Sequence, residues 1–80
     1  MRLDKFLKVS RIIKRRTVAC EFAESGRVMI NGKTAKPSAA VKAGDIITLV
    51  SAGRETRYEV LEVRETVRAN EAGELYRLLD

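Results

Sequence analysis

The sequence predicts a small α+β domain in which two N-terminal helices pack on an antiparallel sheet. Apolar residues recur at helical spacing near the start of the chain, with Leu3, Phe6 and Leu7 as the clearest set. The pattern then changes to strand-like alternation, and the dipeptide Asn31-Gly32 favours a tight hairpin turn. A chain of 80 residues forms one domain with a modest core, because it buries only roughly 60% of its unfolded surface.

The first helix is expected close to the N-terminus. The three apolar residues form one side of it, while Lys5 and Lys8 fall on another side. Asp4 lies in the first turn, where a carboxylate interacts favourably with the helix dipole by about 0.3–1 kcal/mol. We interpret Asp4 as a residue that stabilises the helix in this way.

The second helix is expected over residues 18–25. Thr17 is a candidate N-cap, and Gly26 follows the last residue, as is typical of helix C-termini. Val18 and Phe22 are four residues apart, so we expect both of them to face the core.

The rest of the chain is predicted to form mainly strands. A strand, a turn and a second strand are expected around Asn31-Gly32. The stretch "IITLV" predicts a buried strand, and "TRYEVLEV" predicts a strand that pairs with it as a hairpin. The last segment, "RANEAGELYRLLD", has a helical composition that Gly73 interrupts, so a short C-terminal helix is expected.

Composition excludes several classes of site. The chain has no His and a single Cys, Cys20, which leaves no internal disulfide, no usual zinc-ligand pattern and no His-based catalytic pair. We therefore expect no catalytic residues, no metal site and no cofactor. Only four residues are aromatic, too few for platforms that stack single-stranded bases. No apolar run approaches the roughly 20 residues of a membrane helix, so we expect a cytoplasmic protein without a membrane partner.

Positive charge is concentrated in the first half of the chain. Residues 1–36 carry ten Lys and Arg against three acidic residues, whereas residues 37–80 carry six against eight. Seven of these cations lie within residues 2–16, where Asp4 is the single acid. Like charges at this density repel one another, and a nucleic-acid backbone compensates them while it releases counterions. The asymmetry predicts a polyanionic partner.

The candidate phosphate-binding residues come from the helices and the hairpin that follows them. On helical geometry Lys5 and Lys8 share one side with Arg2, and the cations after them extend this row. A guanidinium grips phosphate through two parallel hydrogen bonds, which makes Arg2 and Arg16 the strongest candidates. The hairpin adds a weaker group that would continue the same surface. The full set is Arg2, Lys5, Lys8, Arg11, Lys14, Arg15, Arg16, Arg27, Asn31, Lys33 and Lys36.

Three motifs in this order carry a resemblance to a known family. "RLDKFL", the helix ending in "ESGRVMINGK" and the stretch "KPSAAVKAGDIITL" resemble the RNA-binding S4 domain of ribosomal proteins, pseudouridine synthases and tyrosyl-tRNA synthetases. The resemblance implies an α-L fold, with two or three N-terminal helices on a small bent antiparallel sheet and a basic helical face set against structured RNA. It implies an S4-type domain over residues 1–65 and a C-terminal tail over residues 66–80.

Within this family the chain resembles stand-alone members of Gram-positive bacteria that carry no catalytic domain. This resemblance implies contacts with large-subunit ribosomal RNA and with peptidyl-tRNA on an obstructed large ribosomal subunit. It also implies a role in ribosome-associated quality control, where an RqcH-type factor adds C-terminal alanine tails. Arg2 and Arg16 match the family positions that we assign to the RNA contacts. The free protein is expected to be a monomer.

Other functions stay open on the sequence alone. A heat-shock-type S4 protein would recycle stalled large subunits instead of supporting tail synthesis, and residues 1–50 would look alike in both. A protein-interaction module would dock a partner through the acidic stretch from Glu55 to Glu74. An RNA-modifying enzyme is disfavoured, because the sequence lacks the catalytic domain that such relatives append.

Overall fold

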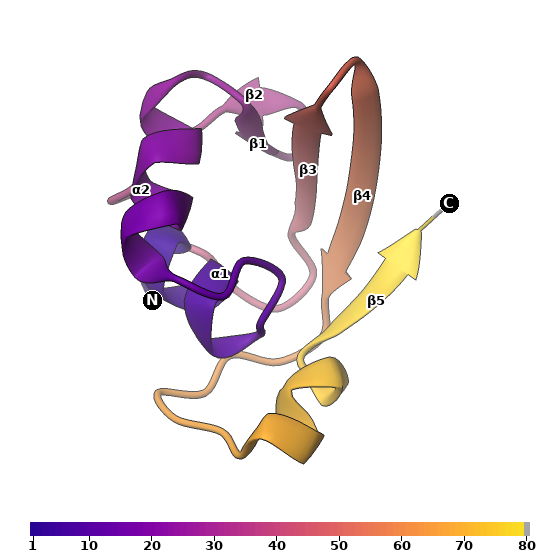
Figure 1. Ribbon diagram of the computed structural model, residues 1–80. Coiled ribbons are helices and arrows are strands. Elements are labelled where there is room, and N and C mark those ends of the chain that lie inside the picture. Colours follow the sequence, from indigo (N-terminus) through magenta and orange to yellow (C-terminus); the bar gives the residue numbers. More distant parts are fainter. Residues whose placement is uncertain (80) are drawn as a thin grey trace.

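The structure is a computed structural model that describes residues 1–79, and its strands form one antiparallel sheet (Figure 1). The sheet has the order β2-β1-β3-β4-β5, and the two α-helices lie together on one side of it. In chain order the elements are α1 (Leu3–Val9), α2 (Arg16–Glu24), β1 (Val28–Ile30), β2 (Lys33–Thr34), β3 (Ile46–Ser51), β4 (Arg54–Val60), the 3-10 helix η1 (Ala69–Glu74) and β5 (Tyr76–Leu79).

The core lies between the helices and the inner face of the sheet. Leu3, Phe6 and Leu7 of α1 are fully buried, so the apolar side predicted from helical spacing is confirmed. On the sheet, Ile47 of β3 and Val60 of β4 are buried in the same core. Burying a side chain of this size contributes about 1.5–3 kcal/mol, which makes these few residues the main source of stability in a small domain.

The second helix differs from its prediction in two respects. It begins at Arg16, and no side chain caps its first turn, so Thr17 is not an N-cap. Ala19 and Ala23 face the core, whereas Val18 is 40% exposed and Phe22 packs only partly against the core. Two apolar pairs at helical spacing lie next to each other on this helix, Val18 with Phe22 and Ala19 with Ala23. Periodicity alone does not show which pair is buried.

Both predicted hairpins are present. Asn31 and Gly32 have φ values of 52° and 83°, the left-handed pair that a type I′ turn between β1 and β2 requires. The turn between β3 and β4 places Ala52 and Gly53 in the same region, with φ values of 51° and 78°.

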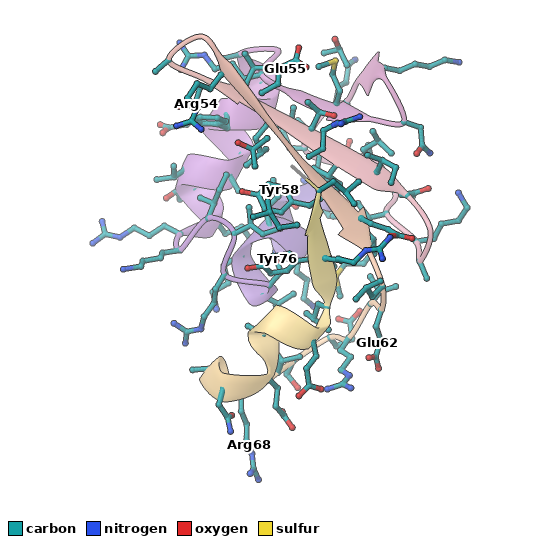
Figure 2. All side chains as sticks on the ribbon, turned by 90° about the vertical axis from the view of Figure 1, so that its right-hand side faces the viewer. Arg54, Glu55, Tyr58, Glu62, Arg68 and Tyr76 are labelled. Atoms are coloured by element: carbon teal, nitrogen blue, oxygen red, sulfur yellow. The ribbon has the colours of Figure 1, made fainter. Side chains whose placement is uncertain are left out.

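The C-terminal segment forms less helix than expected and one strand more. Only Ala69–Glu74 is helical, and β5 then pairs antiparallel with β4 at the edge of the sheet. Tyr58 and Tyr76 from these two strands meet edge to face, with ring centroids 5.4 Å apart (Figure 2). Between η1 and β5, Leu75 is fully buried in the core. A run of four strand residues is too short for periodicity to distinguish it from helix.

The N-terminus is fixed to the loop that precedes β3. The backbone N–H of Val41 donates to the carbonyl of Met1, and the N–H of Leu3 donates to the carbonyl of Ala39, both at 2.8 Å. These bonds hold the first residues in place before α1 begins.

Within residues 1–79, no helix is long and apolar enough to cross a membrane. In the same part of the chain, no group of three or more His, Cys, Asp or Glu side chains is arranged so that it could hold a metal ion.

Candidate nucleic-acid interface

Asp4 binds two arginines where the N-terminal ends of α1 and α2 meet. Its side chain is only 5% exposed. Arg2, which precedes α1, donates from Nε and Nη2 to the two carboxylate oxygens at 3.2 Å each. Arg16, the first residue of α2, donates from Nη2 to Oδ1 at 3.3 Å. The backbone N–H of Lys5 donates to the same oxygen at 2.8 Å, so one carboxylate joins both helices.

The two arginine side chains stay about half exposed while Asp4 holds them. A guanidinium carries five N–H donors, and the bonds to Asp4 use only some of them. Each arginine therefore keeps free N–H donors that could bind a phosphate. Because Asp4 already orients the guanidinium, less conformational freedom would be lost in such a contact.

The contacts with Arg2 and Arg16 stabilise the ionised form of the Asp4 carboxyl. Burial by itself raises the pKa of the carboxyl, but the hydrogen bonds from Arg2 and Arg16 outweigh burial and hold the pKa below its ordinary value. The interpretation of Asp4 as a helix-dipole residue was therefore incomplete, because its main contacts are with the two arginines. The signal in the sequence was its position as the single acid among seven cations.

We expect Asp4→Asn to reduce the loss of stability in acid. Because the folded pKa of Asp4 is depressed, its ionised form stabilises the fold above the ordinary value of 3.8, and this contribution disappears as the pH falls through the folded pKa. The free energy of unfolding of the wild type should therefore decline more steeply below about pH 5 than that of Asp4→Asn. Urea unfolding at stepped pH measures both slopes.

Glu55→Gln is the matched control, since it changes an exposed carboxylate at the tip of the β3–β4 hairpin (Figure 2). Its acid profile should follow that of the wild type. Parallel profiles for the wild type and Asp4→Asn would contradict the role given to Asp4.

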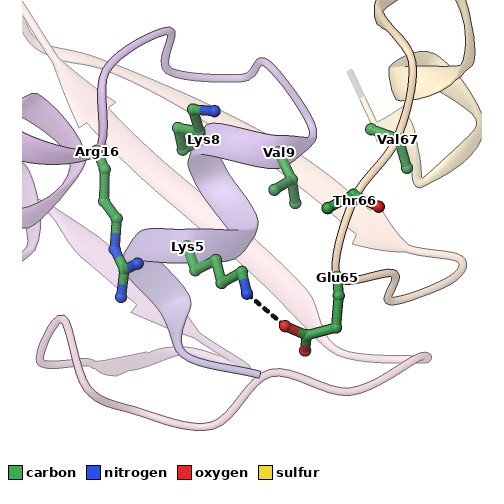
Figure 3. A pocket seen from close by; sticks show the side chains of 7 residues that line it. All are labelled: Lys5, Lys8, Val9, Arg16, Glu65, Thr66 and Val67. Carbon is green, nitrogen blue, oxygen red and sulfur yellow. Dashed lines mark hydrogen bonds and ion pairs between the residues drawn. The ribbon is translucent and has the colours of Figure 1, made fainter.

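A groove lies beside Arg16, between α1 and the segment that connects β4 to η1 (Figure 3). Three of the candidate cations, Lys5, Lys8 and Arg16, line its first side. The connecting segment forms the second side, and there the Glu65 carboxylate makes an ion pair with the Lys5 ammonium. The groove is lined by Lys5, Lys8, Val9, Arg16, Glu65, Thr66 and Val67.

The other helical candidates are exposed between or beside the helices. Arg11, Lys14 and Arg15 belong to the connection from α1 to α2, and all three are exposed. Arg11 has a φ of 61°, so the chain turns sharply directly after α1. These cations extend the positive surface outside the groove.

The hairpin candidates are not part of the groove. The guanidinium of Arg27 lies over the ring of Phe22, 5.6 Å from its centroid, in a hollow on the C-terminal half of α2. Lys33 is exposed in β2, and Lys36 lines a third hollow beside the C-terminal end of α2.

Asn31 is exposed, but its side-chain amide bonds to other residues of the protein. Its Nδ2 donates to Oδ1 of Asp45 at 3.1 Å, and its Oδ1 accepts from the backbone N–H of Ile46 at 2.9 Å. Lys42 donates to the same carboxylate. Burial raises the pKa of Asp45, but these hydrogen bonds outweigh it and lower the pKa below its ordinary value. Asn31 thus ties the first hairpin to β3.

Known proteins that resemble this chain in sequence fall into one family. The model of the S4 domain family matches residues 1–47. The chain is 51% identical over 76 residues to an RQC P-site tRNA stabilizing factor of Halalkalibacterium halodurans, covering 95% of this chain and 86% of that protein. It is 49% identical over 79 residues to a protein of the same name from Bacillus subtilis, covering 99% and 92%.

A solved structure agrees with the sequence relatives. The trimeric structure of Vibrio cholerae Heat Shock Protein 15 superposes with a TM-score of 0.89 at 39% identity, covering 99% of this chain and 81% of that one. The predicted fold class, α+β with N-terminal helices on an antiparallel sheet, is confirmed. With more than half of its length matched by the family model, this chain belongs to the S4 domain family.

Proposed function

We propose that the protein is a non-catalytic RNA-binding factor of ribosome-associated quality control. It binds an obstructed large ribosomal subunit through ribosomal RNA and peptidyl-tRNA. The observation that carries this proposal is the pair of half-exposed arginines, Arg2 and Arg16, that Asp4 fixes on one side of the helices. The relatives named RQC P-site tRNA stabilizing factor support the choice of tRNA as one of the contacts.

The binding surface, which we call the Asp4 face, consists of Arg2, Lys5, Lys8 and Arg16 around Asp4. Paired RNA hides its base edges in a deep and narrow groove, so such a surface recognises shape and phosphates rather than sequence. The remaining candidates take secondary roles. Arg11, Lys14 and Arg15 extend the contact at the connection between the helices, while Arg27, Lys33 and Lys36 meet a separate stretch of RNA and Asn31 positions their hairpin.

The bound protein holds the peptidyl-tRNA in one conformation while an RqcH-type factor adds alanine residues to the nascent chain. In this scheme the protein contributes no chemical step, since its role is to keep the tRNA in place between additions. We propose that the free protein is a monomer, which light scattering of the purified chain tests.

Binding to large subunits that carry peptidyl-tRNA is expected to weaken steeply with salt. Each neutralised phosphate contributes about −0.7 to −0.9 to the slope of log K against log salt, so the four cations of the Asp4 face alone predict a slope of about −3, and the secondary cations make it steeper. Co-sedimentation of the protein with such subunits at stepped potassium chloride concentrations measures this slope. Binding that is independent of salt would contradict the proposed function.

A second candidate function is the recycling of stalled large subunits, which the similarity to Heat Shock Protein 15 favours. Both functions would use the Asp4 face, so binding alone does not separate them. Purified subunits with peptidyl-tRNA, alanyl-tRNA and an RqcH-type factor provide the test. Longer alanine tails on addition of the protein support the first function, whereas an unchanged tail length with faster release of free subunits supports the second.

A further inference from the structure

The groove beside α1 has two chemically different sides. Lys5, Lys8 and Arg16 give the first side three positive charges. The second side carries the carboxylate of Glu65 (Figure 3). A carboxylate on a phosphate-binding surface opposes binding by charge, so its position needs a chemical reason.

Glu65 is held at the groove by the chain on both sides of it. Val63 and Val67, two residues before and after it, pack against the core. Arg64 donates to the Glu62 carboxylate at 2.7 Å and also pairs with Glu74, which links this segment to η1. The contact between Lys5 and Glu65 joins α1 to this segment, 60 residues apart in the sequence.

The groups that RNA offers determine what a carboxylate here can bind. An ionised carboxylate only accepts hydrogen bonds, and phosphate oxygens are also acceptors, so the two do not pair. The 2′-hydroxyl is the one donor on the sugar–phosphate backbone of RNA, and DNA lacks it. A carboxylate that faces a nucleic-acid backbone is therefore satisfied by RNA and only repelled by DNA.

We propose that this groove binds one phosphate–ribose unit of RNA and that Glu65 accepts a hydrogen bond from its 2′-hydroxyl. Lys5, Lys8 and Arg16 bind the phosphate, and the valine side chains of the groove contact the sugar. Glu65 is thereby the residue that distinguishes RNA from DNA. This inference rests on the proposed function, since it presupposes that the Asp4 face binds RNA.

Lys5 connects the two halves of this site. Its ammonium group has three donors, and the ion pair with Glu65 uses one of them. The same group can therefore bind a phosphate while it still holds the carboxylate. RNA binding in this geometry leaves the ion pair intact.

The test compares the affinity of the full chain for a tRNA and for DNA of the same sequence. The wild type should prefer the tRNA, and Glu65→Ala should lower the ratio of the two affinities by about tenfold, as expected for one hydrogen bond to a charged group. Glu65→Gln keeps an acceptor oxygen without the charge and should retain part of the preference. Glu55→Ala removes the same charge at the far hairpin tip and should leave the ratio unchanged (Figure 2).

The ratio isolates the ribose contact from general electrostatics. If Glu65→Ala tightens the binding of both nucleic acids equally, Glu65 is only an anion that competes for Lys5, and the ribose site is overturned. Tight tRNA binding by the wild type with the same ratio in Glu65→Ala also overturns this inference while the proposed function stands. Failure of the wild type to bind tRNA at low salt overturns this inference, whereas failure to bind large subunits that carry peptidyl-tRNA overturns the proposed function.

Discussion

The variant Arg2→Ala with Arg16→Ala is expected to bind large subunits that carry peptidyl-tRNA at least about a hundredfold more weakly than the wild type. Each substitution removes a charge-assisted contact to phosphate of about 1.5–3 kcal/mol, and the two losses add to about 3 kcal/mol or more. The effect should exceed the sum expected from charge alone, because Asp4 holds both groups ready for binding. Co-sedimentation at fixed salt concentration measures the affinity.

Two further variants separate geometry from charge and from folding. Arg2→Lys with Arg16→Lys keeps both charges but loses the forked hydrogen bonds, so its affinity should lie between those of the wild type and the alanine variant. Arg54→Ala with Arg68→Ala removes two exposed arginines at opposite ends of the molecule and should cost only a few-fold (Figure 2). Thermal unfolding monitors stability, since the alanine variant leaves the buried Asp4 without these partners.

The binding mode described here would be wrong under either of two results. Unchanged affinity of the variant Arg2→Ala with Arg16→Ala would mean that these two arginines do not contact the RNA. An equal loss of affinity in the variant Arg54→Ala with Arg68→Ala would mean that Arg2 and Arg16 contribute only general positive charge.

The substitution Leu75→Ala is expected to lower the free energy of unfolding by about 2–5 kcal/mol. Leu75 is fully buried, and its carbonyl accepts hydrogen bonds from the backbone N–H groups of Leu61 and Glu62 at 2.8 and 3.3 Å. In a domain of this size each kcal/mol corresponds to roughly 4–8 °C, so the melting temperature should fall by about 8 °C or more. Circular dichroism with heat and with urea gives both quantities.

Leu78→Ala is the control for this prediction, because it makes the same change three residues later at a side chain that is 61% exposed. Its free energy of unfolding should change by less than about 0.5 kcal/mol. An effect at Leu75 as small as that expected at Leu78 would mean that the C-terminal segment does not stabilise the core.

The elements with strong local signals were predicted from the sequence. The first helix follows from the spacing of Leu3, Phe6 and Leu7, and the first hairpin follows from the Asn31-Gly32 turn. The buried side of α2 and the strand β5 were not predicted. Both depend on packing between segments distant in sequence, which neither periodicity nor composition encodes.

The candidate site was predicted as a set of charges but not as an arrangement. Charge density selected Arg2, Lys5 and Arg16, which the structure places around one carboxylate and one groove. The two acidic residues that pair with these cations, Asp4 and Glu65, were not predicted as part of the site. Asp4 already had a sufficient local explanation in the helix dipole, and Glu65 reaches Lys5 only through the folded path of the chain.

The attachment of the first residues to the loop before β3 has a practical consequence for fusion proteins. The Met1 carbonyl is bonded to Val41, directly beside the arginine that Asp4 orients. A purification tag or fluorophore joined before Met1 would crowd both the loop and this arginine. In Figure 1, β5 lies on the other side of the molecule from the N-terminus, so labels for the binding measurements belong at the C-terminal end.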